Sequence, residues 1–357
     1  MFSPNLRNAG RSAALWATVA LVISAVTHYP GRAMAQSPEE FYSGRQIKFV
    51  VGSAGGGGYE LYSRLLTRYM SRHLPGNPSF VVQMMPGAGG AISANYLYNV
   101  ASRDGSEMGM VGSVVGILPL IAPNNSALRY TATKFNWIGT PQREVGLVLA
   151  RTSSPIRTLA DLTRHELVVS GTSIGGGPSY FPVLLNKLLA TRFKVVVGYK
   201  GSQEALLAIE RGEVDGHVSG SSAAPLRERI RPWIREGKVR VVGLIGLTKD
   251  TEFSEAPLVV DLAQQPIERQ ILEVIFSQQT TAWPVVMPPD VPPERVAAMR
   301  AAFDASVADP DFIAEAAKQK MMLNPLGGKE IQELLVSIYQ TPKQILDRVV
   351  ELSARDK

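Results

Sequence analysis

The chain has 357 residues, of which 45% are hydrophobic and 19% charged, so it can form sizeable cores, and a disordered chain is excluded. It contains no cysteine, which excludes disulfides and thiolate metal sites, and its four histidines lack metal-ligand spacing. The formal net charge is +6, and residues 1–35 contribute three arginines and no acid, so the remainder carries +3. A charge this small and scattered excludes nucleic acid as an expected partner.

The first 35 residues have the pattern of a secretory signal peptide. Arg7 and Arg11 precede an uncharged apolar stretch over residues 13–26, and Ala33-Met34-Ala35 places small residues where a signal peptidase reads. We expect cleavage after Ala35 and export across the cytoplasmic membrane; an uncleaved anchor is the alternative.

From Gln46 onward, short β-branched runs alternate with segments of helical periodicity. The first set predicts strands at 47–51, 80–85 and 108–111 and helices at 59–74 and 92–100. The second set predicts strands at 145–150, 167–170, 193–199, 214–218 and 239–247, and helices at 180–190, 203–211 and around Pro232. Helices are predicted at 294–307, 311–320, 329–339 and 342–354.

This alternation predicts an α/β fold with mostly parallel sheets. The long connections near Val145 and Leu247 suggest that the chain leaves one lobe and returns to it. We expect a first lobe built from 36–145 and 247–357 and a second lobe from 146–246. The strand-to-helix loops would then face a cleft between two sheets, where ligands bind in such folds.

One glycine-rich loop stands between a predicted strand and a predicted helix. It comprises Gly55, Gly56, Gly57, Gly58, Tyr59 and Glu60. Glycines let the backbone approach a ligand, and a helix start offers unpaired N–H donors, so the loop predicts an anion site. Neither G-x-G-x-x-G spacing nor a G-K-[ST] sequence follows, so no nucleotide cofactor is expected. Glu60 suits a structural role at the helix start, with ligand contact as the alternative.

Two further positions follow the next predicted strands. Gly87 and Ala88 belong to a second glycine loop that either adds donors or only permits close packing. Ser113 ends the strand at 108–111, where it could face the cleft or cap a helix.

The second half contains a counterpart of the first glycine loop. It comprises Thr172, Ser173, Ile174, Gly175, Gly176 and Gly177, and it supplies backbone donors and two hydroxyls before a helix. Ser219 and Ser221 follow the strand at 214–218 and could donate to a bound carboxylate or remain solvated loop residues.

A competing function is serine hydrolysis. Residues 171–175 match the G-x-S-x-G nucleophile elbow around Ser173, in a strand–turn–helix context. That reaction needs an acid and then a histidine downstream, and His217 with Asp215 two residues before it is the only candidate pair. This spacing leaves no room for separate acid and histidine loops, so we expect a protein that is not an enzyme.

Several short motifs together resemble the Bug-type extracytoplasmic receptors of the tripartite tricarboxylate transporters. The family's opening G-G-G-T-D corresponds to residues 56–60, and its R-P-G-A-G-G loop to residues 85–90. Asp104-Gly105 matches its D-G turn. The Y-K-G-S and G-x-V-D motifs match residues 199–202 and 212–215.

The resemblance implies a two-lobed, type II Venus-flytrap fold in the periplasm. Loops of both lobes would grip a small organic carboxylate, a di- or tricarboxylate, an amino acid or an aromatic acid, with no cofactor or metal. It also implies transporter membrane subunits as partners, and we expect a monomer; a ligand-sensing partner of a signalling receptor is an alternative. Tyr59, Glu60, Ser179 and Ser219 stand where the family has Thr, Asp, His and often an acid.

Overall fold

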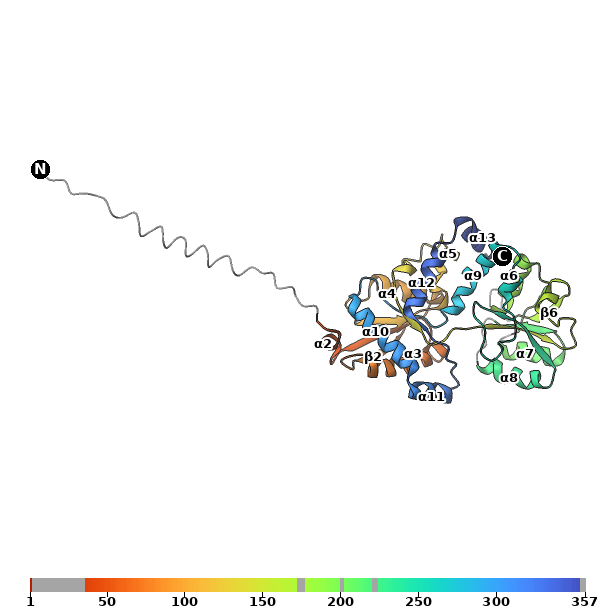
Figure 1. Cartoon of the computed structure of the whole chain (residues 1–357), viewed down its shortest axis with the longest axis horizontal. Coiled ribbons are helices and arrows are strands. Elements are labelled where there is room, and N and C mark those ends of the chain that lie inside the picture. The colour runs from red at the N-terminus through yellow and green to blue at the C-terminus, as the bar shows by residue number, and fades with distance from the viewer. Residues whose placement is uncertain (2–35, 172–176, 200–201, 220–223, 354–357) are drawn as a thin grey trace. The chain divides into compact units, whose positions relative to one another are not determined.

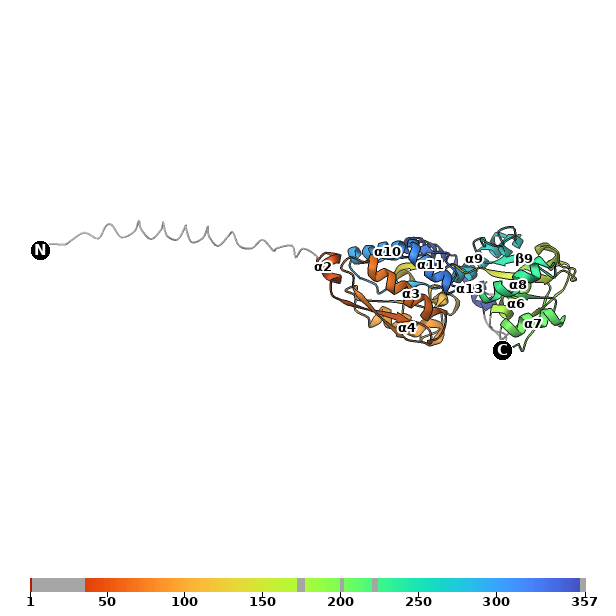
Figure 2. The same cartoon turned by 90° about the horizontal axis from the view of Figure 1, so that it is seen from below.

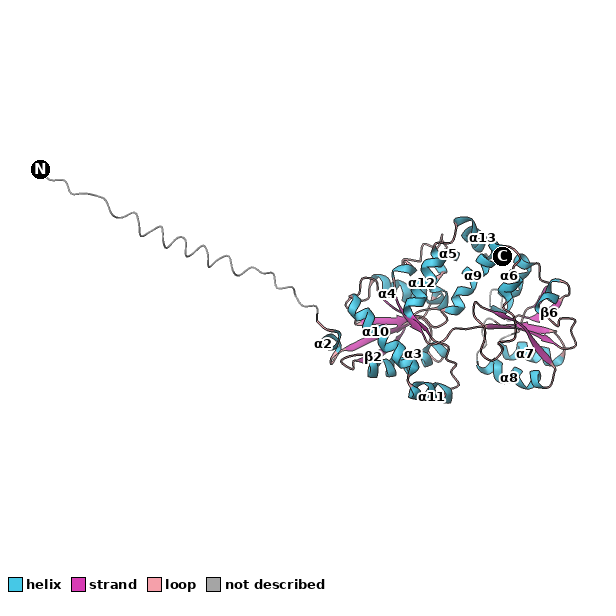
Figure 3. Cartoon of the chain, in the orientation of Figure 1, coloured by secondary structure: helices cyan, strands magenta, loops and turns pink. Residues whose placement is uncertain are grey.

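The computed structural model describes residues 1, 36–171, 177–199, 202–219 and 224–353. Residues Pro38–Lys357 group into one unit. It holds two sheets with helices on both faces, as Figure 3 shows. The predicted signal peptide lies almost entirely outside the described residues.

The first sheet has the strand order β11-β4-β10-β3-β1-β2. Its strands are β1 (Gln46–Val51), β2 (Ser79–Met84), β3 (Glu107–Met110), β4 (Asn136–Thr140), β10 (Val285–Met287) and β11 (Leu326–Gly327). Its helices include α2 (Pro38–Tyr42), α3 (Gly58–His73), α4 (Ala91–Asn99), α5 (Leu118–Ile121), α10 (Pro293–Ala308), α11 (Pro310–Lys318) and α12 (Gly328–Tyr339). Figure 1 shows that α10 and α12, from the C-terminal part of the chain, lie beside this sheet, which contains the early strands.

Alternation along β1 divides the core around the first sheet. Ile47, Phe49 and Val51 pack in one apolar cluster with α3 and α10, while Val50 packs on the other side against α4. Figure 2 shows α4 and α10 on opposite sides of the strands. Successive side chains of a strand point to opposite faces, so a run of apolar residues is buried on both sides.

The second sheet has the strand order β7-β6-β8-β5-β9. Its strands are β5 (Gly146–Arg151), β6 (Leu167–Ser170), β7 (Phe193–Val196), β8 (Gly216–Val218) and β9 (Val239–Ile245), with helices α6 (Gly177–Leu189), α7 (Ser202–Arg211) and α8 (Ala224–Arg235). Leu147 and Leu149 pack with α7 and α8, while Val148 and Ala150 pack in the cluster that contains α6.

The sheets are mixed rather than mostly parallel, because five of the nine strand pairings among the described residues are antiparallel. β1 pairs in parallel with β2 and β3, and β6 with β7 and β8, whereas β4, β10, β11, β5 and β9 pair antiparallel. A parallel pair needs a crossover of a dozen or more residues within one sheet. β4 follows β3 through such a crossover, residues 111–135, and runs in the same direction. The antiparallel pairings of this strand arise because β10, which enters from α9 (Pro266–Thr280), lies between β3 and β4 and runs against both.

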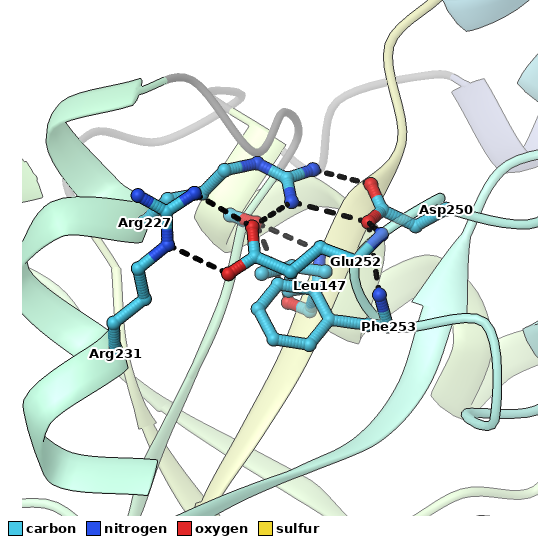
Figure 4. A network of polar contacts seen from close by, with 7 residues as sticks. Leu147, Arg227, Arg231, Asp250, Glu252 and Phe253 are labelled. Carbon is cyan, nitrogen blue, oxygen red and sulfur yellow. Dashed lines mark hydrogen bonds and ion pairs between the residues drawn. The ribbon is translucent and has the colours of Figure 1, made fainter. Parts of the chain in front are cut away.

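The segment after β9 is fixed to the second sheet by a network of charged side chains. Arg227 of α8 binds the carboxylate of Asp250 with two nitrogens, and its Nη1 donates to Glu252 Oε2 at 2.7 Å (Figure 4). Arg231 donates to both oxygens of Glu252, at 2.7 and 3.0 Å. Leu258 then forms a β-bridge with Leu244 of β9. The final helix, α13 (Lys343–Ser353), packs against α9, α5 and α6.

Candidate functional site

The first glycine loop leads directly into α3, as predicted. Gly56 has a φ of +84°, a conformation that side chains disfavour, and Gly55, Gly56 and Gly57 are exposed. Gly57 is the residue before the helix, and no side chain caps it within the described residues. Since the first N–H groups of a helix have no intrahelical acceptor, those of Gly58, Tyr59 and Glu60 remain as donors for an anion.

The Glu60 carboxylate holds the loop closed. Its Oε2 accepts the N–H of Gly56 at 2.7 Å, and its Oε1 pairs with Arg64, one turn further along α3, at 2.7 Å. These hydrogen bonds, first from Gly56 and then from Arg64, lower the pKa of Glu60. The geometry favours the structural role for Glu60 that the helix-start position suggested.

Gly58 and Tyr59 meet an aromatic residue that the sequence analysis did not identify. A side chain at Gly58 would place its Cβ 2.7 Å from the Trp283 ring, so only glycine lets the indole pack over the helix start. The rings of Tyr59 and Tyr62 each lie with their centroids 4.6 Å from that of Trp283. The helix start is therefore bordered by three aromatic rings.

Tyr59 also ties the loop to the neighbouring strand ends. Its hydroxyl donates to the carbonyl of Ala282 at 3.1 Å and accepts the N–H of Ser113 at 3.1 Å. The predicted site residue Ser113 thus lies beside α3, with its backbone N–H already bonded to Tyr59. Its carbonyl accepts a hydrogen bond from Thr281.

The second glycine loop is used for close packing. A Cβ at Gly112 would lie only 2.1 Å from the carbonyl oxygen of Gly89. The loop can therefore approach the end of β3 this closely only because residue 112 is a glycine. Gly87 has a φ of +131° and packs against Ile92, while Ala88 is exposed with a φ of +47°. This geometry supports the packing interpretation of the two that the sequence left open.

Glu144 is a second residue that the sequence analysis missed. It lies in the link between β4 and β5, and its N–H donates to the carbonyl of Gln279 at 2.8 Å. Burial raises the pKa of its carboxyl group to about 7, and interaction with the Trp283 indole offsets part of the rise. The charge of Glu144 adds to the rise in the pKa of Tyr59 and Tyr62 that burial causes, because the carboxylate lies near both hydroxyls.

In the second sheet only part of the predicted site can be placed. Residues 172–176 and Ser221 lie outside the described residues. Gly177 is the first residue of α6 and is half-buried. Ser219 is buried, and its Oγ accepts the N–H of Leu147 at 2.8 Å, so this hydroxyl extends the pairing of β5 with β8.

His217 belongs to the core of the second sheet. It is 1% exposed, and its Nδ1 lies 3.0 Å from Ser170 Oγ. Burial lowers its pKa to about 4, so the imidazole is neutral at pH 7. Ser173, the serine of the hydrolase hypothesis, lies outside the described residues.

Neither a metal site nor a membrane span occurs among the described residues. No group of three or more histidine, aspartate or glutamate side chains within this part of the chain is arranged to hold a metal ion. Likewise, none of the described helices is long and apolar enough to cross a bilayer.

Two mixed sheets flanked by helices, with glycine-rich strand-to-helix loops, have the architecture of two-lobed solute-binding proteins. Comparisons with known proteins agree. The model of the TctC family, the tripartite tricarboxylate transporter family receptor, matches residues 63–345. The chain belongs to this family of periplasmic solute-binding receptors, which are not enzymes, so the serine hydrolase alternative has no support.

Solved structures share the fold. A TctC solute-binding protein from Polaromonas, solved without ligand, is 18% identical with a TM-score of 0.66, over 86% of this chain and 99% of that one. The periplasmic binding protein BugD is 19% identical with a TM-score of 0.52, over 87% and 97%. An R. palustris protein with adipate is 19% identical with a TM-score of 0.53, over 87% and 97%. No curated protein matches the chain in sequence.

Proposed function

We propose that the protein captures a small organic carboxylate in the periplasm and presents it to the membrane subunits of a tripartite tricarboxylate-type transporter. The observation that supports a carboxylate as the ligand is the start of α3. This helix has 16 residues, and its N-terminus has no side-chain cap among the described residues. Its open N–H groups and the positive end of its dipole suit a carboxylate, since hydrogen bonds to an ionised acceptor are strong. Adipate, in the R. palustris protein, is such a carboxylate.

The remaining parts of the proposal follow from the sequence. Residues 1–35 would be removed as a signal peptide, and the exported chain would act as a monomer. Its first lobe would comprise 36–145 and 247–357, and its second lobe 146–246. The loop at 172–177 would supply the second set of donors, so that a bound ligand draws the two lobes together.

The proposal is tested with a thermal-shift screen of mono-, di- and tricarboxylates, amino acids and aromatic acids. A ligand that binds only the folded protein raises the melting temperature. At a ligand concentration a hundredfold above Kd, it adds about 2.7 kcal/mol to the free energy of unfolding. We expect at least one class of carboxylate to do so without being turned over. The proposal is wrong if no carboxylate shifts the melting temperature.

A matched pair of variants locates the binding site. Gly57 has a negative φ of −114°, and no atom lies within 4 Å of the position that a Cβ would take there. Gly57→Ala therefore preserves the fold but adds a methyl group beside the proposed donors. We expect it to weaken carboxylate binding by about tenfold. Gly327, which precedes α12, also has a negative φ, and a Cβ there would lie 2.9 Å from the carboxylate end of the Glu330 side chain, which can turn away. Gly327→Ala is therefore the control that should bind normally.

A further inference from the structure

The strand β2 is the last strand of the first sheet, and among the described residues it pairs only with β1. The N–H of Ser79 donates to the carbonyl of Arg45 at 3.0 Å, and the N–H of Met85, just after the strand, donates to that of Val51 at 2.7 Å. The odd-numbered residues therefore face β1. Since backbone groups alternate in direction along a strand, the even-numbered residues point their N–H and carbonyl groups outward. These outward residues are Phe80, Val82 and Met84.

The other sheet edges in the described parts of the chain are protected against pairing. β11 has only two residues, and β7 carries the exposed Lys194. The edge of β9 is covered, because the N–H of Leu244 donates to the carbonyl of Pro257 at 2.8 Å. Proteins commonly protect an edge by shortness, charge, proline or a covering segment, and β2 has six residues with neither a charge nor a proline. An unprotected edge of this length indicates a surface that pairs with another strand.

Apolar side chains lie on both faces of this edge. Phe80, Val82 and Met84 are half-buried against the apolar cluster that contains α3, and Val81 on the opposite face is 43% exposed. β2 lies beside α3 (Figure 1), and a hollow of about 490 Å³ is lined by residues of both elements, Phe80 and Val82 among them. A strand added to β2 would cover these side chains and fill part of the hollow, which favours its binding.

The α3 side of the hollow is basic. Arg64 and Arg68 line it, and their side chains are 60% and 50% exposed although they pair with Glu60 and Glu315. Arg72, one turn further along α3, is exposed and has no acid partner among the described residues. Residues four apart share one face of a helix, so the three guanidinium groups form a row. Exposed ion pairs contribute little, so this arginine row can bind further carboxylates.

We propose that the outer edge of β2 receives an extended segment of a partner protein that carries acidic side chains. Backbone hydrogen bonds to the outward residues hold the segment, and the arginine row selects its charge. A second copy of this chain fits this edge less well, because two β2 strands paired about a twofold axis would bring two arginine rows to the same face. The identity of the partner rests on the proposed function, which makes it a membrane subunit of the transporter.

The first test uses two short peptides as probes, acetyl-TEVEVET-amide and its basic counterpart acetyl-TKVKVKT-amide. Hydrogen exchange is followed by NMR in ¹⁵N-labelled protein. The acidic peptide at saturation should slow the exchange of the outward amides of Phe80, Val82 and Met84 by about tenfold. The amides of Val81 and Gln83 face β1 and should not change. The basic peptide should bind about tenfold more weakly than the acidic one.

Val82→Pro removes one outward N–H and leaves the hydrogen bonds to β1 in place. We expect it to weaken binding of the acidic peptide by about tenfold. Val81→Glu keeps the backbone intact and should weaken the same binding by charge repulsion across the strands. Val336→Glu is its matched control, since that valine lies on α12 and is 41% exposed. Melting curves check that all three variants are folded.

The same variants test the partner. The membrane subunits of the transporter are reconstituted in nanodiscs, and the affinity of the carboxylate-loaded protein for them is measured. Val82→Pro and Val81→Glu should each lower this affinity by about tenfold, and Val336→Glu should leave it unchanged.

Three results overturn the inference. If the two peptides bind equally, or if neither slows the outward amides, β2 does not receive an acidic strand. If the protein alone sediments as a dimer that Val82→Pro dissociates, a second copy occupies the edge. If the membrane subunits bind Val82→Pro as tightly as the unmodified protein, they dock elsewhere. Each of these results leaves the proposed function intact, which fails separately if no carboxylate shifts the melting temperature.

Discussion

Asp250 is buried and Glu144 is half-buried, and of these two carboxylates only Asp250 has an arginine against it among the described residues. Arg227, 2% exposed, holds Asp250 with two nitrogens and also binds Glu252, which Arg231 binds from the other side. Glu144 has an aromatic cluster around it and no cation within the described residues. A compensated carboxylate can hold a fold together, whereas an uncompensated one costs stability.

The largest effect should follow from breaking the compensated pair. Arg227→Met leaves Asp250 buried without its cation, and we expect the free energy of unfolding to fall by about 3–5 kcal/mol. Urea denaturation measures it. Arg231→Met is the control, because that side chain is 51% exposed and its ion pair should contribute at most about 1 kcal/mol. Equal losses in the two variants would show that the buried pair does not anchor the segment after β9.

The next largest effect is the pH dependence of stability caused by Glu144. Its pKa is raised from 4.5 to about 7, so the folded state holds the proton more tightly than the unfolded state. The contribution of Glu144 to the free energy of unfolding is therefore most favourable below pH 4.5. It declines by at most about 3 kcal/mol as the pH rises through about 7.

Glu144→Gln should remove this decline and be more stable than the unmodified protein above about pH 7. His217 acts in the opposite direction, because its pKa is lowered from 6.5 to about 4 and its contribution is lost as the pH falls between those values. The difference between the two unfolding curves isolates Glu144, since both proteins contain His217. Parallel curves from pH 4.5 to 7 would show that Glu144 is solvated like an ordinary surface acid.

The smallest effect concerns the link between the aromatic cluster and the strand ends. Tyr59→Phe keeps the ring against Trp283 but leaves the N–H of Ser113 without its acceptor, so stability should fall by about 1–2 kcal/mol. Tyr98→Phe is the control, because the Tyr98 hydroxyl makes no hydrogen bond within the described residues. Thermal denaturation of both variants checks this, and an equal loss in both would contradict the role given to the Tyr59 hydroxyl.

Much of the fold was predictable because the apolar periodicity of a segment ends where helix- or strand-terminating residues occur. The strand predicted at 167–170 has those bounds in β6, and the helix predicted at 329–339 is α12 with one more residue. β10 was missed because its three residues follow Pro284 and precede Pro288, so no alternation can be recognised.

The helix α9 was missed although its sequence carried a signal. Pro266 occupies its first turn, and Glu268 accepts the N–H of Gln265 at 3.0 Å in a capping box. Proline at a helix start followed by an acid is a recognisable N-terminal pattern. Caps considered together with apolar periodicity would have located this helix, which ends at Thr280, three residues before Trp283.

The candidate site was predictable only where a motif marked it. Glycines before a helix indicated the start of α3, and the structural role preferred for Glu60 agrees with its hydrogen bond to Gly56. Glu144 and Trp283 have no motif, because an acid between two strands resembles any surface residue. Their meeting depends on segments 139 positions apart in the chain, and only the folded arrangement brings them together.

The most direct test of the uncompensated carboxylate is its own titration. In protein labelled with ¹³C at glutamate side chains, the Glu144 carboxyl signal can be assigned by its loss in Glu144→Gln. We predict a pKa of about 7. A pKa near the ordinary 4.5 would contradict the account.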